Sequence, residues 1–356
     1  MNTKKQYEVR RIFKLLALAL ASIMLITGLL SCKSENTPDV PDSESQSGNE
    51  LPNEEGVNLD VMVLNGTTGM GAAAMIDKYA ESTDARFNFE IVSAADVVTA
   101  AIIGGEVDIA AVPTNLAAVL YNKTNGGVAV AAVNTKGVLY VLSTDNSVTS
   151  INDLRGKTVY VPGLGSNPEY ILKHLCEESG LRVGQDVVID GATYPSPDEL
   201  ATAVASGNAP LALLPEPKVT AVTTQNTNVK VAINVTAEWE RVFGSDKPLV
   251  QGCIIVRTEI LEKYPATVDA FLKEYKESVE LVNENPEEAA KLIAKAGIVP
   301  KEALALKAIP RCNICYMDGD EMVDALDHLY NALFSLEPKS VGGKLPDSGI
   351  YYKASK

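Results

Sequence analysis

From Val57 onward, short apolar runs alternate with segments that carry apolar residues at helical spacing. The runs include NLDVMVLNG, FNFEIVS and VDIAAVP, and the segments between them include MGAAAMIDKYAES and ADVVTAAIIGG. This alternation is typical of α/β folds with mostly parallel sheets, because each strand leads into a helix that returns the chain to the sheet. The sequence therefore predicts an α/β fold built from strand–helix units.

The alternation occurs twice along the chain. Three units are followed by a long extended stretch, GVAVAAVNTKGVLYVLST, which is broken at Gly137, and the pattern then restarts at KTVYVPG. Long helical segments are expected at residues 266–283, 286–295 and 320–334, and we expect them to return and cover the first lobe. The prediction is a two-lobed protein, in which residues 57–140 and 250–356 form lobe 1 and residues 141–249 form lobe 2.

The N-terminus has the features of a secretory signal. A basic head precedes an unbroken apolar run that starts at Leu15 and ends at Leu29-Leu30-Ser31-Cys32. The small residue before Cys32, with an aliphatic residue three positions upstream of that cysteine, resembles a bacterial lipobox. This predicts removal of residues 1–31 and a lipid on Cys32. The alternative is an uncleaved transmembrane anchor, for which the run is only marginally long enough.

Residues 32–56 are expected to form a flexible acidic tether. The stretch is polar, acidic and proline-bearing, so it cannot bury enough apolar surface to fold. The whole chain has a net charge of −15, and the leader carries five basic residues and one acidic residue, so its removal leaves −19. Such a body would be repelled by nucleic acid and by anionic lipid surfaces. We expect an extracytoplasmic protein that is anchored to the bacterial cell membrane by its lipid.

The sequence RCNIC contains a C-x-x-C motif at Cys312 and Cys315, which can indicate zinc binding or redox chemistry. We interpret residues 312–316 as extended, and residues three apart on a strand point to opposite faces at about 10 Å, too far for a disulfide. A zinc site would need two more ligands. We therefore expect both cysteines to be structural, with no metal and no cofactor.

Several junctions between a strand and the next helix carry small polar residues. In open parallel sheets, ligands bind beyond the carboxyl ends of the strands, where these junctions lie. After the strand VDIAAVP we expect Thr114 as N-cap, and in PGLGSNPEY we expect Asn167 as N-cap and Pro168 as the first helical residue. The amides at the start of that second helix are expected to be free to bind an anion or a polar acceptor. The alternative is that these residues only cap helices. The candidate ligand-binding residues are Asn65, Thr67, Thr68, Thr114, Asn115, Ser166, Asn167, Glu216 and Gln251.

Glu216 stands apart because it lies between two prolines, directly after the apolar run Leu211–Leu214. Pro215 and Pro217 have fixed φ angles and so hold Glu216 in one place. We hypothesise that Glu216 accepts a hydrogen bond from a solute, or from the facing lobe when the lobes close. The alternative is that it faces solvent or a partner protein.

Cofactor-binding motifs do not match. Gly66-x-x-Gly69-x-Gly71 follows a strand, but its glycine spacing differs from the dinucleotide fingerprint G-x-G-x-x-G. Gly163-x-Gly165 lacks the lysine and hydroxyl residue of a phosphate-binding loop. No Ser-His-Asp set, histidine cluster or pair of acids suggests catalysis.

The segments VDIAAVPTNLAAVLYN, SINDLRGKTVYVPGLGSNPEYILKHL, LALLPEPKVT and EKYPATVDAFLKEYKESVELVNENPEEAAKLI resemble substrate-binding lipoproteins of ABC importers. The resemblance is to the nitrate, sulfonate, taurine and thiamine-precursor type, and it covers most of residues 59–352. It implies a type II periplasmic binding protein, in which two hinge strands join two lobes that clamp a ligand. The crossings would fall near residues 137–143 and 249–255.

The resemblance also implies a function and partners. The protein would bind a small solute such as a sulfonate, nitrate or a pyrimidine-like heterocycle, and would deliver it to an ABC permease with its ATPase. We expect a monomer without enzymatic activity. Neutral donors and helix N-termini favour an anion, whereas a carboxylate at Glu216 favours an uncharged or amine-bearing solute. The alternatives are an enzyme acting on a small heterocycle with this fold, and a surface adhesion or sensor lipoprotein.

Overall fold

The computed structural model describes residue 54 and residues 56–83 and 86–353. The predicted leader, the lipidation at Cys32 and nearly all of the predicted tether lie outside these residues. Glu54 is the exception, because its carboxylate accepts hydrogen bonds from the hydroxyl of Thr267, at 2.8 Å, and from the backbone amide of the same residue, at 3.4 Å. Contacts of the folded body therefore extend to a residue that the sequence placed in the tether.

The first sheet has six strands in the order β11-β4-β10-β3-β1-β2. β1 pairs in parallel with β2 and β3, whereas β10 lies antiparallel between β3 and β4. β1 to β4 therefore share one direction, and β10 and β11 run the opposite way. The strands are β1 (Leu59–Leu64), β2 (Phe87–Val92), β3 (Ile109–Pro113), β4 (Val128–Lys136), β10 (Val250–Arg257) and β11 (Ile314–Met317).

The second sheet repeats this arrangement with five strands in the order β7-β6-β8-β5-β9. β6 is parallel to β7 and β8, and β5 lies antiparallel between β8 and β9. The strands are β5 (Leu139–Ser143), β6 (Thr158–Tyr160), β7 (Val188–Asp190), β8 (Leu211–Pro215) and β9 (Lys230–Asn234). In each sheet, the strand that comes directly after a crossing from the other sheet lies antiparallel between two neighbours. This strand is β10 in the first sheet and β5 in the second. The two sheets are thus the centres of two lobes with the same topology.

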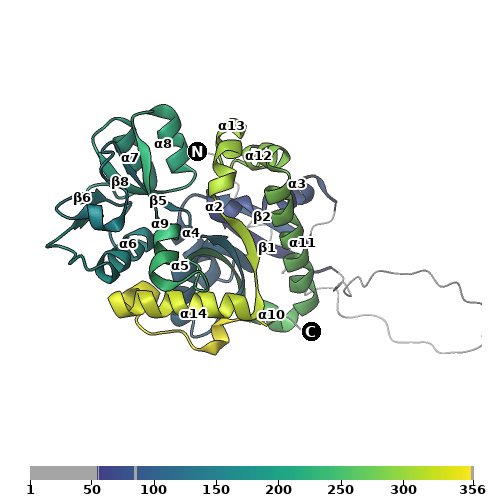
Figure 1. The fold of residues 1–356 in the computed structure, drawn as a ribbon. Coiled ribbons are helices and arrows are strands. Elements are labelled where there is room, and N and C mark those ends of the chain that lie inside the picture. Colours follow the sequence, from purple (N-terminus) through teal and green to yellow (C-terminus); the bar gives the residue numbers. More distant parts are fainter. Residues whose placement is uncertain (1–53, 55, 84–85, 354–356) are drawn as a thin grey trace, which may run out of the picture. The chain divides into compact units, whose positions relative to one another are not determined.

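Helices cover both faces of each sheet (Figure 1). The helices of lobe 1 are α2 (Thr67–Met70), α3 (Ala73–Glu81), α4 (Ala95–Ile103), α5 (Thr114–Lys123), α10 (Thr258–Lys263), α11 (Pro265–Glu284), α12 (Pro286–Lys295), α13 (Glu302–Ala308) and α14 (Gly319–Leu336). Those of lobe 2 are α6 (Asn167–Glu178), α7 (Pro197–Ala205) and α8 (Lys218–Gln225), and α9 (Val235–Phe243) lies in the second crossing. The 3-10 turns are η1 (Ile151–Leu154), η2 (Ile309–Arg311), η3 (Pro338–Val341) and η4 (Ser348–Ile350).

The alternating side chains of β1 show how one strand supports two cores. Leu59, Val61 and Val63 face α3, α11 and α12, whereas Met62 and Leu64 belong to the core on the opposite face. That second core includes residues of α4, α5 and α14 and continues into lobe 2 through α6 and α9. This period of two explains why the strand reads as a continuous apolar run, since both faces are buried. The long C-terminal helices cover the first sheet, as the sequence predicted.

Two crossings of the chain connect the lobes. The first runs from β4, which ends at Lys136, to β5, which begins at Leu139. The second runs from β9 through α9 to β10. α9 was not predicted from the sequence, although Asn234 caps it and Val235 and Trp239, four residues apart, are both buried. The lobes also touch through α6 with α14 and through α8 with α13, two regions that lie apart in Figure 1.

Three local predictions need correction. Ser166, not Asn167, caps α6, because the hydroxyl of Ser166 accepts a hydrogen bond from the backbone amide of Glu169. Pro113, not Thr114, stands at the cap of α5. The extended segment predicted from Cys312 starts only at Ile314, because Cys312 has helical backbone angles and Asn313 has a φ of 44°.

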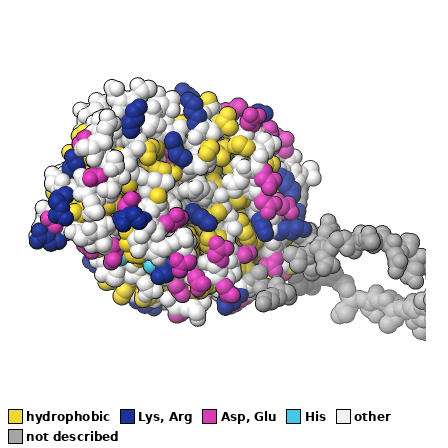
Figure 2. All heavy atoms as spheres, in the orientation of Figure 1, with side chains coloured by type: hydrophobic (Ala, Val, Ile, Leu, Met, Phe, Trp, Pro, Cys, Tyr) yellow, Lys and Arg dark blue, Asp and Glu magenta, His cyan; other side chains and the backbone are white. Residues whose placement is uncertain are grey.

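No helix in the part of the chain that the structure describes is long and apolar enough to cross a membrane. Figure 2 shows acidic and basic side chains intermixed over the face drawn, with acidic side chains on α14. Those exposed on α14 are Asp320, Glu321, Asp324 and Asp327. The negative charge that the sequence predicted is therefore displayed on the folded body.

Candidate functional site

The lobe 1 side of the candidate site is the turn that follows β1. Asn65 is exposed, and its amide donates to the Ser93 hydroxyl at 3.2 Å. Gly66 has a φ of 96° and stands against lobe 2, since a Cβ at this position would lie 4.0 Å from Cδ of Pro217. Thr67 and Thr68 follow as the half-buried first residues of α2. The turn thus places small polar groups beside the exit of β8 in the other lobe.

A buried network holds this turn in place. The side-chain amide of Asn134, on β4, donates to the backbone oxygen of Thr68 at 3.1 Å and to the hydroxyl of Tyr275 at 3.0 Å. The hydroxyl of Thr135 donates to the side-chain oxygen of Asn134 at 3.0 Å. Gly252 leaves room for the network, because a Cβ there would lie 2.5 Å from Oδ1 of Asn134 and 2.7 Å from Cγ2 of Thr68. Asn134 and Gly252 were not among the predicted site residues.

The lobe 2 side begins at the start of α6. The carboxylate of Glu169 accepts a hydrogen bond from the backbone amide of Gly165 at 2.5 Å and forms an ion pair with Lys173 at 2.8 Å. Glu169 is almost fully buried, so the positive end of the α6 dipole is already compensated by a carboxylate of the chain itself. Its neighbour Asn167 is 8% exposed, and the side-chain oxygen has no hydrogen-bond partner. The sequence had predicted that the amides at the start of this helix are free, but those of Gly165 and Glu169 are hydrogen-bonded to side chains of the same segment.

Glu216 connects the two lobes. Its side chain is fully buried, and Oε1 accepts a hydrogen bond from Nε of Arg311 at 2.6 Å. Thr220 donates to the same carboxylate through its hydroxyl, at 3.0 Å, and through its backbone amide, at 3.1 Å. Nη2 of Arg311 also donates to the Thr220 hydroxyl at 2.6 Å. In this structure, Glu216 therefore does not face solvent, and its partner comes from the facing lobe.

Tyr140 adds a further contact between the lobes. Its hydroxyl, at the start of the second sheet, donates to the backbone oxygen of Arg311 at 3.2 Å. Burial, followed by the negative charge of Glu216, raises the pKa of Tyr140 to about 12. The phenol therefore stays protonated at physiological pH and remains a hydrogen-bond donor to Arg311.

Other predicted residues are used within the scaffold. Thr114 is fully buried, its hydroxyl donates to the backbone oxygen of Val250 at 3.0 Å, and Asn115 donates to that of Ser340 at 3.5 Å. The side-chain oxygen of Gln251 accepts from the amide of Val138 at 2.7 Å, which ties β10 to the first crossing. Thr114 and Asn115 are therefore bonded within lobe 1, away from Glu216. Gln251 lies near Glu216, because the backbone oxygen of the same Val138 accepts from the Glu216 amide at 3.0 Å.

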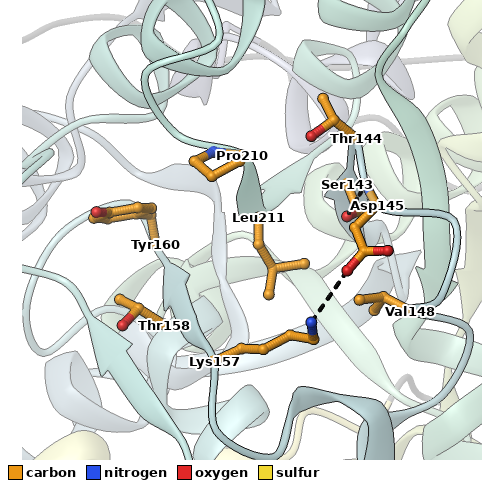
Figure 3. A pocket seen from close by; sticks show the side chains of 9 residues that line it. All are labelled: Ser143, Thr144, Asp145, Val148, Lys157, Thr158, Tyr160, Pro210 and Leu211. Atoms are coloured by element: carbon orange, nitrogen blue, oxygen red, sulfur yellow. Dashed lines mark hydrogen bonds and ion pairs between the residues drawn. The ribbon is translucent and has the colours of Figure 1, made fainter.

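Two hollows in the described surface lie on lobe 2. One, of about 350 Å³, lies at the amino ends of β6 and β8, where Lys157 and Asp145 form an ion pair at 3.1 Å (Figure 3). The other, of about 560 Å³, lies along α7 between Thr193 and Asn208. Neither is lined by the predicted site residues. We place the candidate site at the carboxyl ends of the strands, because backbone groups and helix starts from both lobes converge there.

The cysteines of the C-x-x-C motif are free thiols, and Cys312 is fully buried. Burial raises the pKa of both Cys312 and Cys315, which lowers the reactivity of the thiols. Among the described residues, no group of three His, Cys, Asp or Glu side chains is placed to hold a metal ion.

The only two histidines of the chain meet where α6, α9 and α14 pack together. The ring of His174 stacks on Phe243 with centroids 5.1 Å apart, and the ring of His328 meets Phe243 edge-on at 5.1 Å. Burial lowers the pKa of His174 against the opposing effect of Glu177 and Glu178. Burial, Lys247 and His174 lower the pKa of His328, and Asp246 opposes this shift.

These shifts predict a loss of stability on mild acidification. A histidine with a lowered pKa in the folded state is neutral there while the unfolded chain takes up protons. The contribution of each neutral histidine to the free energy of unfolding is therefore complete above the ordinary pKa of 6.5, and it declines as the pH falls below that value. Between pH 7 and 5.5, we expect the free energy of unfolding to fall by up to about 1.4 kcal/mol per pH unit per histidine. Urea unfolding followed by fluorescence of Trp239 measures this, and an unchanged slope in a His174→Gln/His328→Gln variant would contradict it.

Comparisons with known proteins place this fold. A crystal structure of an ABC transporter protein from Parabacteroides distasonis has a TM-score of 0.70 and 23% identity, covering 84% of this chain and 100% of that one. The periplasmic aliphatic sulphonate-binding protein SsuA of Escherichia coli has a TM-score of 0.67 and 16% identity, covering 84% and 93%. The nitrate-binding protein NrtA of Synechocystis PCC 6803 has a TM-score of 0.56 and 14% identity, covering 76% of each chain. No curated protein sequence matches the chain.

Two lobes with matching sheets and two crossings define a type II periplasmic binding protein fold, which confirms the predicted fold class. The chain belongs to the NMT1/THI5-like family, whose model matches residues 84–289. This confirms the resemblance noted in the sequence, because the proteins of similar fold include binding proteins for sulphonate and nitrate.

Proposed function

We propose that the chain is an extracytoplasmic solute-binding lipoprotein that captures a small polar solute between its lobes and delivers it to the permease of an ABC importer. The observation that carries this proposal is the junction of the two lobes. There, the turn after β1 faces the exit of β8, with Gly66 beside Pro217 and Arg311 bonded to Glu216. The binding functions of proteins with similar folds support the same role.

Capture requires no covalent chemistry. An open and a closed form exchange about the two crossings, and a solute that touches both lobes stabilises the closed form. Because β5 begins at Leu139, residues 139–249 would move as lobe 2 against residues 57–138 and 250–356 as lobe 1, a boundary two residues earlier than the sequence predicted. The closed form would then be the one that the permease and its ATPase recognise. The protein acts as a monomer in this scheme, and the lipid on Cys32 holds it at the outer face of the membrane.

The charges at the junction bear on the class of solute. The carboxylate of Glu216 is balanced by Arg311, and that of Glu169 by Lys173, so neither carboxylate requires a cationic solute. The side chain of Arg311 remains 39% exposed although it is bonded to Glu216, and the polar side chains of the turn after β1, Asn65, Thr67 and Thr68, are neutral. These groups suit a small uncharged or singly anionic solute. A sulfonate, nitrate and a pyrimidine-like heterocycle all remain candidates.

A thermal-shift screen tests this function. The protein is purified from the membrane fraction, where a lipid on Cys32 would retain it, and is heated with sulfonates, nitrate, pyrimidines and short peptides. We expect one chemical class to raise the melting temperature, because a ligand present at 100 times its Kd stabilises the folded state by about 2.7 kcal/mol. Absence of the protein from the membrane fraction would contradict the lipid anchor. Turnover of a hit, or no shift with any class, would contradict the binding role.

A further inference from the structure

One short segment of lobe 1 makes a concentrated set of polar contacts with lobe 2. Arg311, the last residue of η2, donates to Glu216 and Thr220 at the start of α8, with both distances at 2.6 Å. The backbone oxygen of Arg311 accepts from the Tyr140 hydroxyl. Two residues later, the side-chain amide of Asn313 donates to the backbone oxygen of Gly137 in the first crossing. A single residue, Arg311, thus contacts two different elements of the other lobe.

Breaking the contact between Arg311 and Glu216 is energetically unfavourable for the buried carboxylate of lobe 2. Each oxygen of the Glu216 carboxylate has a hydrogen-bond partner, and the side chain is fully buried. Two of its three bonds come from Thr220 in its own lobe, and Arg311 supplies the only positive charge bonded to it among the described residues. Withdrawal of Arg311 would leave a buried carboxylate without its counter-charge, which is strongly unfavourable until water replaces it.

We propose that Arg311 is a positioning residue that clamps the two lobes together in the absence of solute. Glu216 and Thr220 are the groups of lobe 2 that accept its hydrogen bonds. In this scheme, Glu216 acts on the lobe equilibrium and does not touch the solute. The inference rests on the proposed function only in that the lobes open and close. It goes further, because it assigns part of the free energy that favours the closed form to a contact within the protein and not to the solute.

The clamp has a consequence for solute affinity. When only the closed form retains a solute, the apparent affinity is proportional to the closed fraction of the solute-free protein. A variant that weakens the clamp should therefore lose affinity by the factor by which its closed fraction falls. A residue that contacts the solute directly would lower the affinity and leave the lobe equilibrium of the free protein unchanged.

The experiment measures lobe separation in the full chain without solute. Spin labels on unnatural amino acids replace Thr224, exposed on α8, and Glu280, exposed on α11, so that the native cysteines are untouched. Electron–electron double resonance then gives the distance distribution for the wild type and for Arg311→Gln and Glu216→Gln. Arg311→Lys is a milder change that keeps the charge but loses the forked geometry. Thermal unfolding of each variant verifies that it is folded.

We expect one dominant distance in the wild type and, in Arg311→Gln and Glu216→Gln, a longer distance whose population relative to the short one rises about tenfold or more. Arg311→Lys should give an intermediate result. The matched control is Arg257→Gln, because Arg257 pairs with Asp108 at 3.3 Å entirely within lobe 1. Distributions that are unchanged in folded Arg311 variants, or changed equally by Arg257→Gln, would overturn the proposal. No solute is present, so failure of the clamp is distinguishable from failure of the solute-binding role.

Discussion

Truncating Trp239 to alanine is expected to reduce the free energy of unfolding by about 3–5 kcal/mol, the range for loss of a large buried aromatic side chain. Trp239 is fully buried where α6, α9 and α14 meet, and its ring lies 4.5 Å from that of Phe243. The indole also donates to the backbone oxygen of Lys247 at 3.0 Å. The neighbouring rings of His174, Phe243 and His328 belong to three different helices, so truncation removes packing contacts with all three.

Urea unfolding followed by far-ultraviolet circular dichroism measures this effect, since the only tryptophan of the chain is removed. Trp239→Phe is the matched control. It keeps an aromatic ring but leaves the oxygen of Lys247 without its donor, so we expect a loss of about 1–3 kcal/mol. If Trp239→Ala lowered the free energy of unfolding by less than about 1 kcal/mol, or if Trp239→Phe lowered it as much as Trp239→Ala, the packing of α6, α9 and α14 would not depend on this side chain.

Replacing Gly252 with alanine is expected to disrupt the candidate site from the inside. The new Cβ would lie 2.5 Å from Oδ1 of Asn134, 2.7 Å from Cγ2 of Thr68 and 2.9 Å from Oγ1 of Thr135, so these groups must move. Overpacking of this kind costs about 1–3 kcal/mol of stability. Because Asn134 positions the turn that carries Thr67 and Thr68, we also expect the affinity for a solute identified in the screen to fall about tenfold or more.

Calorimetric titration and urea unfolding measure the two effects separately. The double variant Gly252→Ala/Thr68→Ser removes the methyl group that clashes and should recover part of the stability. A Gly252→Ala protein with wild-type stability would show that the network around Asn134 yields without cost. Wild-type affinity in a destabilised Gly252→Ala protein would instead place the solute away from the turn after β1.

Local periodicity was sufficient for most of the architecture. The strands β1, β3, β4, β5 and β8 fell within apolar runs noted in the sequence, because strands buried on both faces contain few polar residues. The helices α11, α12 and α14 were found for a related reason, since they carry apolar stripes over many turns. α9 was missed although it has a cap and buried residues four apart, and the second crossing predicted from the sequence, near residues 249–255, begins only after this helix.

The candidate site was only partly predictable. The position of Glu216 between two prolines, directly after a buried strand, indicated a fixed carboxylate at a lobe junction, and the structure places it there. Arg311 carried no such signal. It lies 95 residues further along the chain, in a 3-10 turn next to a C-x-x-C motif that drew the interpretation toward metal and redox chemistry.

The amino-acid sequence by itself determined the order of strands and helices, the repetition of one topology in two lobes and the location of polar junctions at the strand ends. These features follow from residue patterns that extend over a few turns or one strand. The tertiary structure alone decided which group neutralises Glu216 and which side chains hold the turn after β1. Those pairings join residues that are distant in the chain, and only the packing of the lobes brings them within hydrogen-bond distance.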